Sequence, residues 1–242
     1  MRARPMVCLF LALSVPEPPL GAQSLDDFAA WTSLIRSPVG AVVPTPPLSR
    51  AEGIGTSRAI TIGYGTWRFG PGDDETTNLA LGLRFGRGPR TFTLDAVRTS
   101  VKDCSNCGGW SLGVGAIVPL LAVGLGTEGE TRGVQYDVAV QPSVSLGGFG
   151  GGSRSSISAA VSLPASLRVP LGGLVIRPFV APGYGYGRLS GNGTSASGMR
   201  MLIGYGLALG NARGTLQAHV GSMQVKLEGA PSVTGFGLAV RF

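Results

Sequence analysis

Long apolar runs are missing from this 242-residue sequence, and their absence excludes one class of membrane protein. A membrane-spanning helix needs about 20 consecutive apolar residues, and no segment of the chain is that long. Charged residues are also scarce, at 14% of the chain, and His219 is the single histidine. One histidine and three cysteines leave little material for a metal centre. We therefore expect neither a helical membrane protein nor a bound metal ion or other cofactor.

Clusters of basic residues are missing as well, although the formal net charge is +7. Only two lysines occur, Lys102 and Lys226, and the arginines are scattered singly along the chain. Proteins that bind nucleic acid usually concentrate lysine and arginine on one face or in a recognisable motif. The sequence contains no such motif, and we expect no nucleic-acid partner.

Glycine, in contrast, is abundant, and apolar residues follow a strict two-residue period. Forty glycines in 242 residues is more than double the usual share of roughly 7%. Alternation of apolar with small or polar residues is typical of strands with one apolar face. The clearest apolar rows are Leu79, Leu81, Leu83 and Phe85; Val134, Tyr136, Val138 and Val140; and Met199, Met201, Ile203, Tyr205, Leu207 and Leu209. Several alternating segments run for about ten residues, which suffices for a tilted strand to cross a bilayer.

The alternation predicts an all-β protein, a closed antiparallel up-and-down transmembrane β-barrel of about ten strands, with eight as the alternative. The predicted strands cover residues 59–69, 76–87, 90–100, 109–118, 132–146, 155–169, 174–187, 197–210, 213–225 and 232–242. Short connections after even-numbered strands and longer polar ones after odd-numbered strands fit periplasmic turns and external loops. Residues 119–131 are too long and too apolar for such a turn. They either extend two strands or form a short periplasmic element.

Charged side chains on these strands are expected to face the lumen, because lipid offers them no partner. The predicted polar network of the lumen consists of Arg84, Asp95, Arg98, Asp137, Arg177, Arg200, His219 and Arg241. Side chains can largely fill a barrel of this size, so we expect a plugged polar core. A narrow water-filled pore with an arginine-based preference for anions is the alternative.

The first 24 residues have the organisation of a secretory signal peptide. Arg2 and Arg4 precede an apolar run over Met6–Val15, and a small-x-small cleavage site ends at Ser24. The predicted organisation is a signal peptide at 1–24, a periplasmic N-terminal tail with a proline-rich linker at 25–58, and the barrel at 59–242.

Phe236, Leu238, Val240 and the terminal Phe242 form one apolar row in the last predicted strand. This row resembles the C-terminal strand of bacterial outer-membrane β-barrels, which closes the barrel and carries the signal read by the insertion machinery. The resemblance implies an integral protein of the bacterial outer membrane, with both termini in the periplasm. It also implies contact with outer-membrane lipid and lipopolysaccharide, and the barrel-insertion machinery as a partner. The partner of the external loops is not identified by the sequence.

Cys104 and Cys107 lie in the predicted external loop after the third strand. Two cysteines cannot form a four-ligand zinc site. The segment after them, beginning with Gly108, predicts a strand rather than the helix of a thioredoxin-like motif. We expect a small structural disulfide between these two cysteines.

Catalysis is a weaker hypothesis, although small membrane barrels include proteases and lipid A-modifying enzymes. His219 and Ser222 are three residues apart on one predicted strand, so they should face opposite sides. We therefore expect a non-catalytic barrel with a structural or surface-interaction role. A narrow passive diffusion channel for small solutes is the alternative, and a lipid A-modifying enzyme is a further one.

Overall fold

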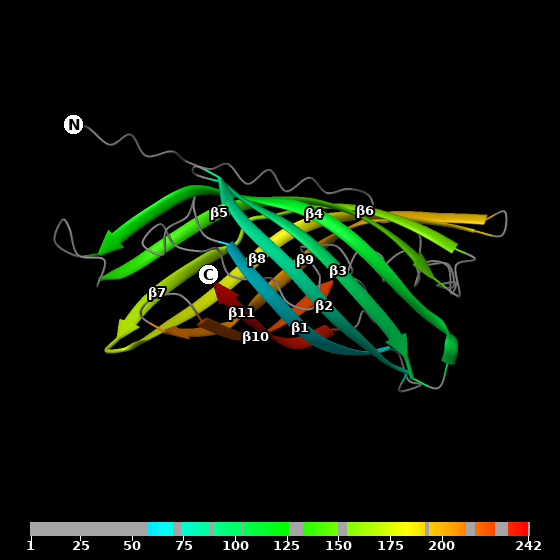
Figure 1. The fold of residues 1–242 in the computed structure, drawn as a ribbon. Coiled ribbons are helices and arrows are strands. Elements are labelled where there is room, and N and C mark those ends of the chain that lie inside the picture. The colour runs from blue at the N-terminus through cyan, green and yellow to red at the C-terminus, as the bar shows by residue number, and fades with distance from the viewer. Residues whose placement is uncertain are drawn as a thin grey trace.

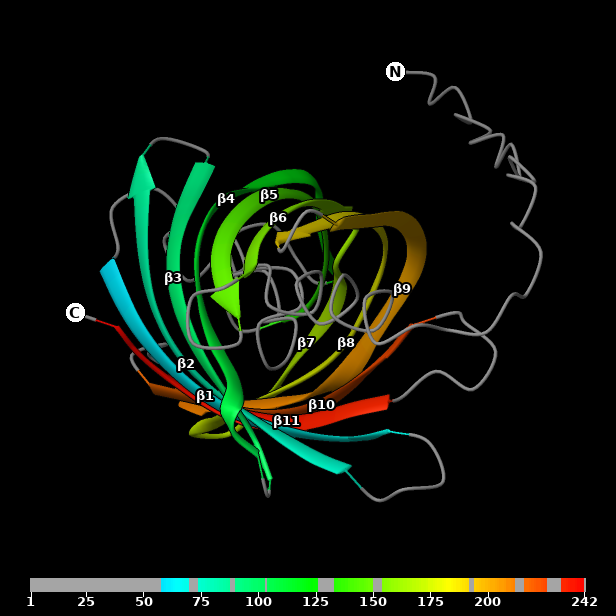
Figure 2. The same ribbon diagram turned by 90° about the vertical axis from the view of Figure 1, so that its right-hand side faces the viewer.

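The computed structural model is one antiparallel β-sheet that curls round on itself (Figures 1 and 2). It describes residues 58–69, 74–87, 90–102, 104–125, 133–149, 154–191, 194–211, 216–225 and 232–241. The expected signal peptide, almost all of the expected tail and the terminal Phe242 lie outside these residues. Within the described ranges no helix is both long and apolar enough to cross a membrane.

Eleven strands make up the sheet within the described residues. Their bounds are β1 Arg58–Phe69, β2 Asp74–Arg87, β3 Arg90–Val101, β4 Cys104–Leu125, β5 Val134–Phe149, β6 Arg154–Ser162, β7 Ala165–Leu171, β8 Leu174–Gly191, β9 Thr194–Asn211, β10 Leu216–Val225 and β11 Ser232–Arg241. Each predicted strand has a counterpart among them. The difference in number arises because one predicted strand, 155–169, corresponds to both β6 and β7.

The division between β6 and β7 falls at Leu163 and Pro164. Proline has no backbone N–H and cannot donate to a strand ladder. The neighbouring groups still bond across the interruption: the Leu163 amide donates to the Pro182 carbonyl at 2.8 Å, and the Ala139 amide donates to the Pro164 carbonyl at 2.9 Å. Both β6 and β7 pair with β5 on one side and β8 on the other. They therefore occupy one position in the sheet.

The strand pairings form a continuous circuit. β1 pairs with β2 and with the last strand, β11, while β4 pairs with both β3 and β5. A path can be followed from Phe179 on β8 by moving from each residue to its paired residue on the next strand. The path passes through β9, β10, β11, β1, β2, β3, β4, β5 and β6, and it returns to β8 at Gly191. The path thus rises by twelve residues in one circuit, which is the kind of stagger that strand tilt produces.

The two ends of the sheet differ in their connections. Ala59 pairs with Arg241, so the sheet begins and finishes at the same end. That end also carries the two-residue turn between β7 and β8, where Gly172 has a φ of 61° that favours glycine. We call it the turn end, and the opposite end the loop end.

The β4–β5 and β7–β8 hairpins both project at the turn end (Figure 1). Leu125 pairs with Val134, with a bulge between Pro119 and Leu121. Of the two alternatives for residues 119–131, extension of the strands is therefore correct for 119–125. Residues 126–132 lie outside the described part of the chain.

Burial is inverted relative to that of a water-soluble protein. On β2, Leu79 and Leu81 are 56% and 52% exposed, whereas the intervening Ala80 is 9% exposed. Among the described side chains, eighteen polar or charged residues are buried, against eleven apolar ones. The outer face is thus an apolar surface, and the inner face is small and polar.

Candidate functional site

The polar inner face is the candidate functional site, and it contains most of the predicted lumen residues that can be placed. Arg84, Asp137, Arg177 and His219 are all at most 8% exposed on this face. Asp95 also faces inward, where it pairs with Gly82, and is partly exposed. The side chains of Arg200 and Arg241 lie outside the described set.

Arg98 lies on the outer face, so its assignment to the lumen was wrong. It is exposed and pairs with Leu79 on β2 and Trp110 on β4, both of which face outward. The physical reason is the two-residue period of a strand. Asp95 and Arg98 are three residues apart on β3, so they cannot both point inward.

One group of charges gathers on the β2–β3 side of the lumen. Gly82 pairs with Asp95 and is two residues from Arg84. Arg84 lies close enough to interact electrostatically with Asp95 and also with His219 on β10. A Cβ at Gly82 would overlap the Asp95 carboxylate and the Thr61 hydroxyl. Glycine at this position therefore makes room for the acidic side chain beside the arginine.

A second group of charges lies on the opposite wall, formed by β5, β7 and β8. Asp137 pairs with Ser166, and Gln135 pairs with Arg168. Arg168 is 5% exposed and Arg177 is 2% exposed. The sequence pattern put Arg168 on the inner face of its strand, but the predicted network did not include it. The β7–β8 register was needed to bring it beside Arg177.

An apolar contact crosses the lumen next to these charges. Phe179, on β8, forms one buried cluster with Ala80 of β2 and Val97 of β3. In the circuit of pairings, β8 and β2 lie on opposite sides. The Phe179 ring also lies over Gly206 of β9, where an added Cβ would come 2.7 Å from the ring Cζ. The sequence analysis did not single out Phe179, because nothing in the alternating pattern distinguishes an inward phenylalanine that crosses the lumen from other inward positions.

Hydroxyl groups dominate the described lumen on the loop-end side of Phe179. Thr99 donates a 2.5 Å hydrogen bond to the Asn78 side-chain carbonyl, and the hydroxyls of Ser145 and Ser158 lie 2.6 Å apart. Both pairs are buried and join neighbouring strands. A neutral hydrogen bond of this kind reduces the cost of burying the two oxygens that it joins.

His219 and Ser222, the two residues weighed for catalysis, lie on opposite faces of β10. His219 faces inward and pairs with buried Ala208, whereas Ser222 pairs with exposed Tyr205 on the outer face. The described residues also contain no group of three histidine, cysteine, aspartate or glutamate side chains that could hold a metal ion. The structure therefore does not bring His219 and Ser222 together as a base and a nucleophile.

Two further predictions fall partly or wholly outside the described side chains. The side chains of Cys104 and Cys107 are not described, so the disulfide between them stays a prediction. In the C-terminal row, Leu238 and Val240 face outward at 42% and 45% exposure. The Phe236 side chain lies outside the described set, although its backbone pairs with Tyr64 and Val220.

No protein-family model matches the chain, and comparison with curated proteins finds no similar sequence. Solved structures with a similar strand arrangement include Ail, the attachment invasion locus protein of Yersinia pestis, in complex with the heparin analogue sucrose octasulfate. This match has 13% sequence identity and a TM-score of 0.36, and it covers 78% of this chain and all of that chain. The N-terminal β-barrel domain of Pseudomonas aeruginosa OprF matches at 10% identity and a TM-score of 0.34, covering 78% of this chain and 98% of that chain.

LpxR from Salmonella typhimurium matches at 9% identity and a TM-score of 0.42, covering 76% of this chain and 99% of that chain. With TM-scores of 0.42 or less, these three likenesses carry no weight for the activity or partners of this chain.

Proposed function

We propose that this chain is an integral β-barrel of the bacterial outer membrane, with a structural or surface-interaction role and no catalytic activity. The observation that carries the proposal is the apolar outer face, which runs around the circuit of strands. Large side chains that are exposed on it include Ile62, Leu81, Leu94, Leu112, Val144, Ile157, Val180, Leu207, Val220 and Leu238. Monomers in water rarely expose a contiguous apolar patch of more than a few hundred Å². Lipid is the partner that fits an apolar belt of this extent.

The distribution of exposed charge supports the same environment. The exposed charged residues among the described side chains are Arg58, Arg90, Arg98, Lys102 and Arg188. Each of them lies within three residues of the end of a strand. A charge near the bilayer interface can reach the headgroups, whereas one at the midplane cannot.

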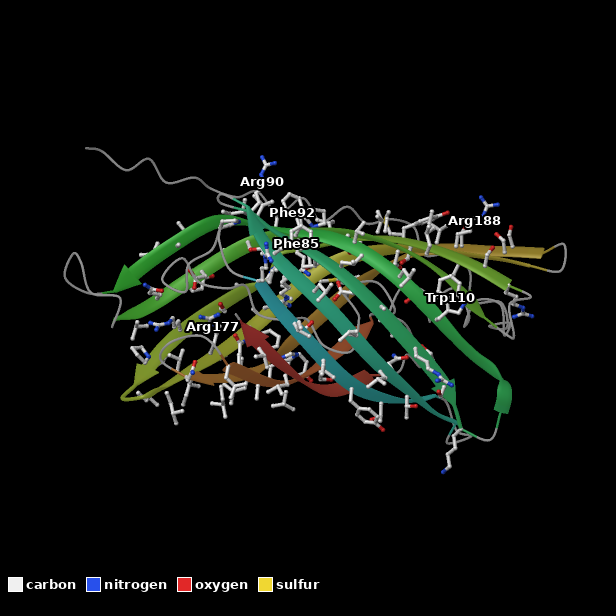
Figure 3. All side chains as sticks on the ribbon, viewed as in Figure 1. Phe85, Arg90, Phe92, Trp110, Arg177 and Arg188 are labelled. Carbon is white, nitrogen blue, oxygen red and sulfur yellow. The ribbon has the colours of Figure 1, made fainter. Side chains whose placement is uncertain are left out.

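The positions of the aromatic residues are consistent with a membrane–water interface at each end of the sheet. Phe85 and Phe92 stack at the turn end, with ring centroids 5.7 Å apart. Trp110 lies toward the loop end with Arg188 (Figure 3). Outward aromatic girdles at both interfaces are typical of membrane barrels.

The proposed barrel has ten transmembrane strands, with β6 and β7 counted together, and it is closed by β1 and β11. A stagger of twelve residues over ten strands corresponds to a tilt of about 40°. At that tilt the 12 residues of β1 span about 30 Å, enough for the apolar band of roughly 25 Å. Since β1 begins and β11 finishes at the turn end, we assign that end and both termini to the periplasm.

We propose further that the lumen is occluded rather than open. The support is the Phe179–Ala80–Val97 cluster, which joins opposite walls. A passive channel needs a continuous water-filled path, and an apolar cluster across the lumen interrupts it.

Two measurements test these proposals. Outer-membrane fractions run on a denaturing gel with and without boiling should show a band that migrates faster unheated, because a closed barrel stays compact in detergent. A soluble protein without a heat-dependent shift would contradict the membrane assignment. Purified protein in planar bilayers should show no stable single-channel steps, and reproducible steps would instead favour the passive-channel alternative.

A further inference from the structure

The β4–β5 hairpin extends beyond its neighbour β3 at the turn end (Figure 1). The last pair that β3 forms with β4 in this direction is Thr91 with Ile117, and β3 begins one residue earlier, at Arg90. β4 continues to Leu125, and over this stretch it pairs with β5 alone among the described residues. We call residues 118–125 the free edge of β4.

The free edge is apolar and presents backbone groups on the side away from β5. Its sequence is Val-Pro-Leu-Leu-Ala-Val-Gly-Leu, without a charged residue. In an antiparallel strand the N–H and C=O groups of successive residues point alternately to the two edges, so about half of those in this stretch point away from β5. Pro119 and the bulge after it interrupt only the first part of the edge. Natural proteins usually interrupt or cover such an edge, because it pairs readily with an extended chain.

The N-terminal tail of the same chain joins the sheet on the side that the free edge faces. The strands follow one another in the order β4, β3, β2, β1, so the free edge is directed toward β1. β1 begins at the turn end, at Arg58, and the expected tail precedes it outside the described residues. The three strand spacings between β1 and β4 amount to about 15 Å.

One segment of the tail has the composition of a short edge strand. Residues 39–43 read Val-Gly-Ala-Val-Val and are flanked by Pro38 and Pro44. Valine favours strands, and proline is tolerated at the first residue of a strand and on an edge, where it discourages further pairing. Residues 44–57 connect this segment to β1, and 14 extended residues span up to about 45 Å. The segment can therefore reach the free edge easily.

We propose that residues 39–43 pair with the free edge of β4 as an additional antiparallel edge strand. The pairing supplies partners for the backbone groups that point away from β5, and the flanking prolines limit the new strand to five residues. A tether of this kind favours the tail over an outside partner, because a short flexible linker gives an effective concentration in the range of about 1 mM. The pairing does not depend on the proposed role at the cell surface.

A second copy of the chain fits the free edge less well. Two copies in one membrane would both direct β4 toward the turn end, so their free edges could not form an antiparallel ladder with each other. Occupation of the edge should accordingly be independent of protein concentration.

Backbone hydrogen exchange of the purified full chain in detergent tests the pairing. In the parent, all amides of residues 120–125 should exchange slowly. In the double variant Ala41→Pro/Val42→Pro every second one should exchange at least about tenfold faster, because its partner strand is lost. Neighbouring residues point to opposite edges, so one of the two prolines removes a ladder donor in either register. Ser49→Pro, in the connecting segment, is the matched control and should keep the slow exchange.

Cysteine cross-linking covers the case in which the double variant does not fold. With the native cysteines replaced by serine, Val42→Cys should form a disulfide with a cysteine placed in turn at positions 121, 122 and 123. It should not do so with Leu171→Cys, which is also exposed at the turn end but lies on β7.

Three results would overturn the proposal. The first is fast exchange of alternate free-edge amides in the parent. The second is slow exchange that persists in a folded double variant or disappears on dilution, since another occupant would then cover the edge. The third is cross-linking of Val42→Cys without preference for the free edge over Leu171→Cys.

Discussion

Replacing Leu81 by arginine distinguishes a lipid-facing surface from a water-facing one by the size of its effect on stability. Leu81 is the eighth of the 14 residues of β2 and is 52% exposed. It pairs with Ile62 and Ala96, and Ile62 pairs in turn with Leu238, so its neighbourhood on the outer face is apolar.

The expected cost follows from its depth. An arginine at the bilayer midplane destabilises a membrane barrel by about 2–4 kcal/mol, and one near the interface by about 0–1 kcal/mol. Leu81→Arg should therefore lower the folding equilibrium constant by roughly 30-fold to 700-fold. Leu120→Arg is the matched control, since Leu120 is 59% exposed on the part of β4 that projects at the turn end. Its cost should not exceed about 1 kcal/mol.

Reversible urea unfolding in phospholipid vesicles, followed by tryptophan fluorescence, measures both variants. On a surface in contact with water, exchanging an exposed leucine for arginine would change the stability by no more than about 0.5 kcal/mol. Equal, small effects of the two substitutions would therefore refute the placement of the outer face in lipid.

Three more predictions concern the inner face. Phe179→Ala should produce resolvable single-channel conductance in planar bilayers while the outward Phe85→Ala does not; silent bilayers from a correctly folded Phe179→Ala would show that the ring does not close the lumen. Gly206→Val should cost about 1–3 kcal/mol by overpacking, because an added Cβ would meet the Val220 carbonyl oxygen and the Gly221 Cα of β10 as well as the Phe179 ring. Combining it with Phe179→Ala should recover only the part of that cost that the ring causes; fully additive losses would argue against the contact with the ring. Thr99→Val leaves the buried Asn78 carbonyl without its donor and should cost about 1–3 kcal/mol in urea unfolding, whereas an unchanged midpoint would mean that this hydrogen bond contributes nothing net.

The sequence predicted the strands well because their two-residue period is a local property. The alternation around Leu81 and around Leu207 marks one apolar face without any knowledge of a partner strand. The turn after β7 was also readable, since Gly172-Gly173 follows an apolar row and glycine tolerates the positive φ found there. The break at Pro164 was not foreseen, because its neighbours keep the same alternation across it.

The candidate site was only partly predictable. The two-residue period of each strand is enough to put Asp137, Arg177 and His219 on inner faces. Applied consistently to β3, the same period would also have excluded Arg98 from the lumen. Which charges become neighbours is a different question, because it depends on the register between strands that are distant in sequence. Asp137 comes near Arg168 only through the β5–β7 pairing.

The amino-acid sequence by itself determined the β-strand period, the apolar outer rows and the confinement of most charges to the other face, because each follows from residue type and local spacing. Only the tertiary structure decided that β1 meets β11, that Phe179 joins opposite walls, and that Arg168 lies opposite Arg177. These depend on the stagger accumulated around the sheet. Stagger is set jointly by all the strand pairs, so no single segment of the chain encodes it.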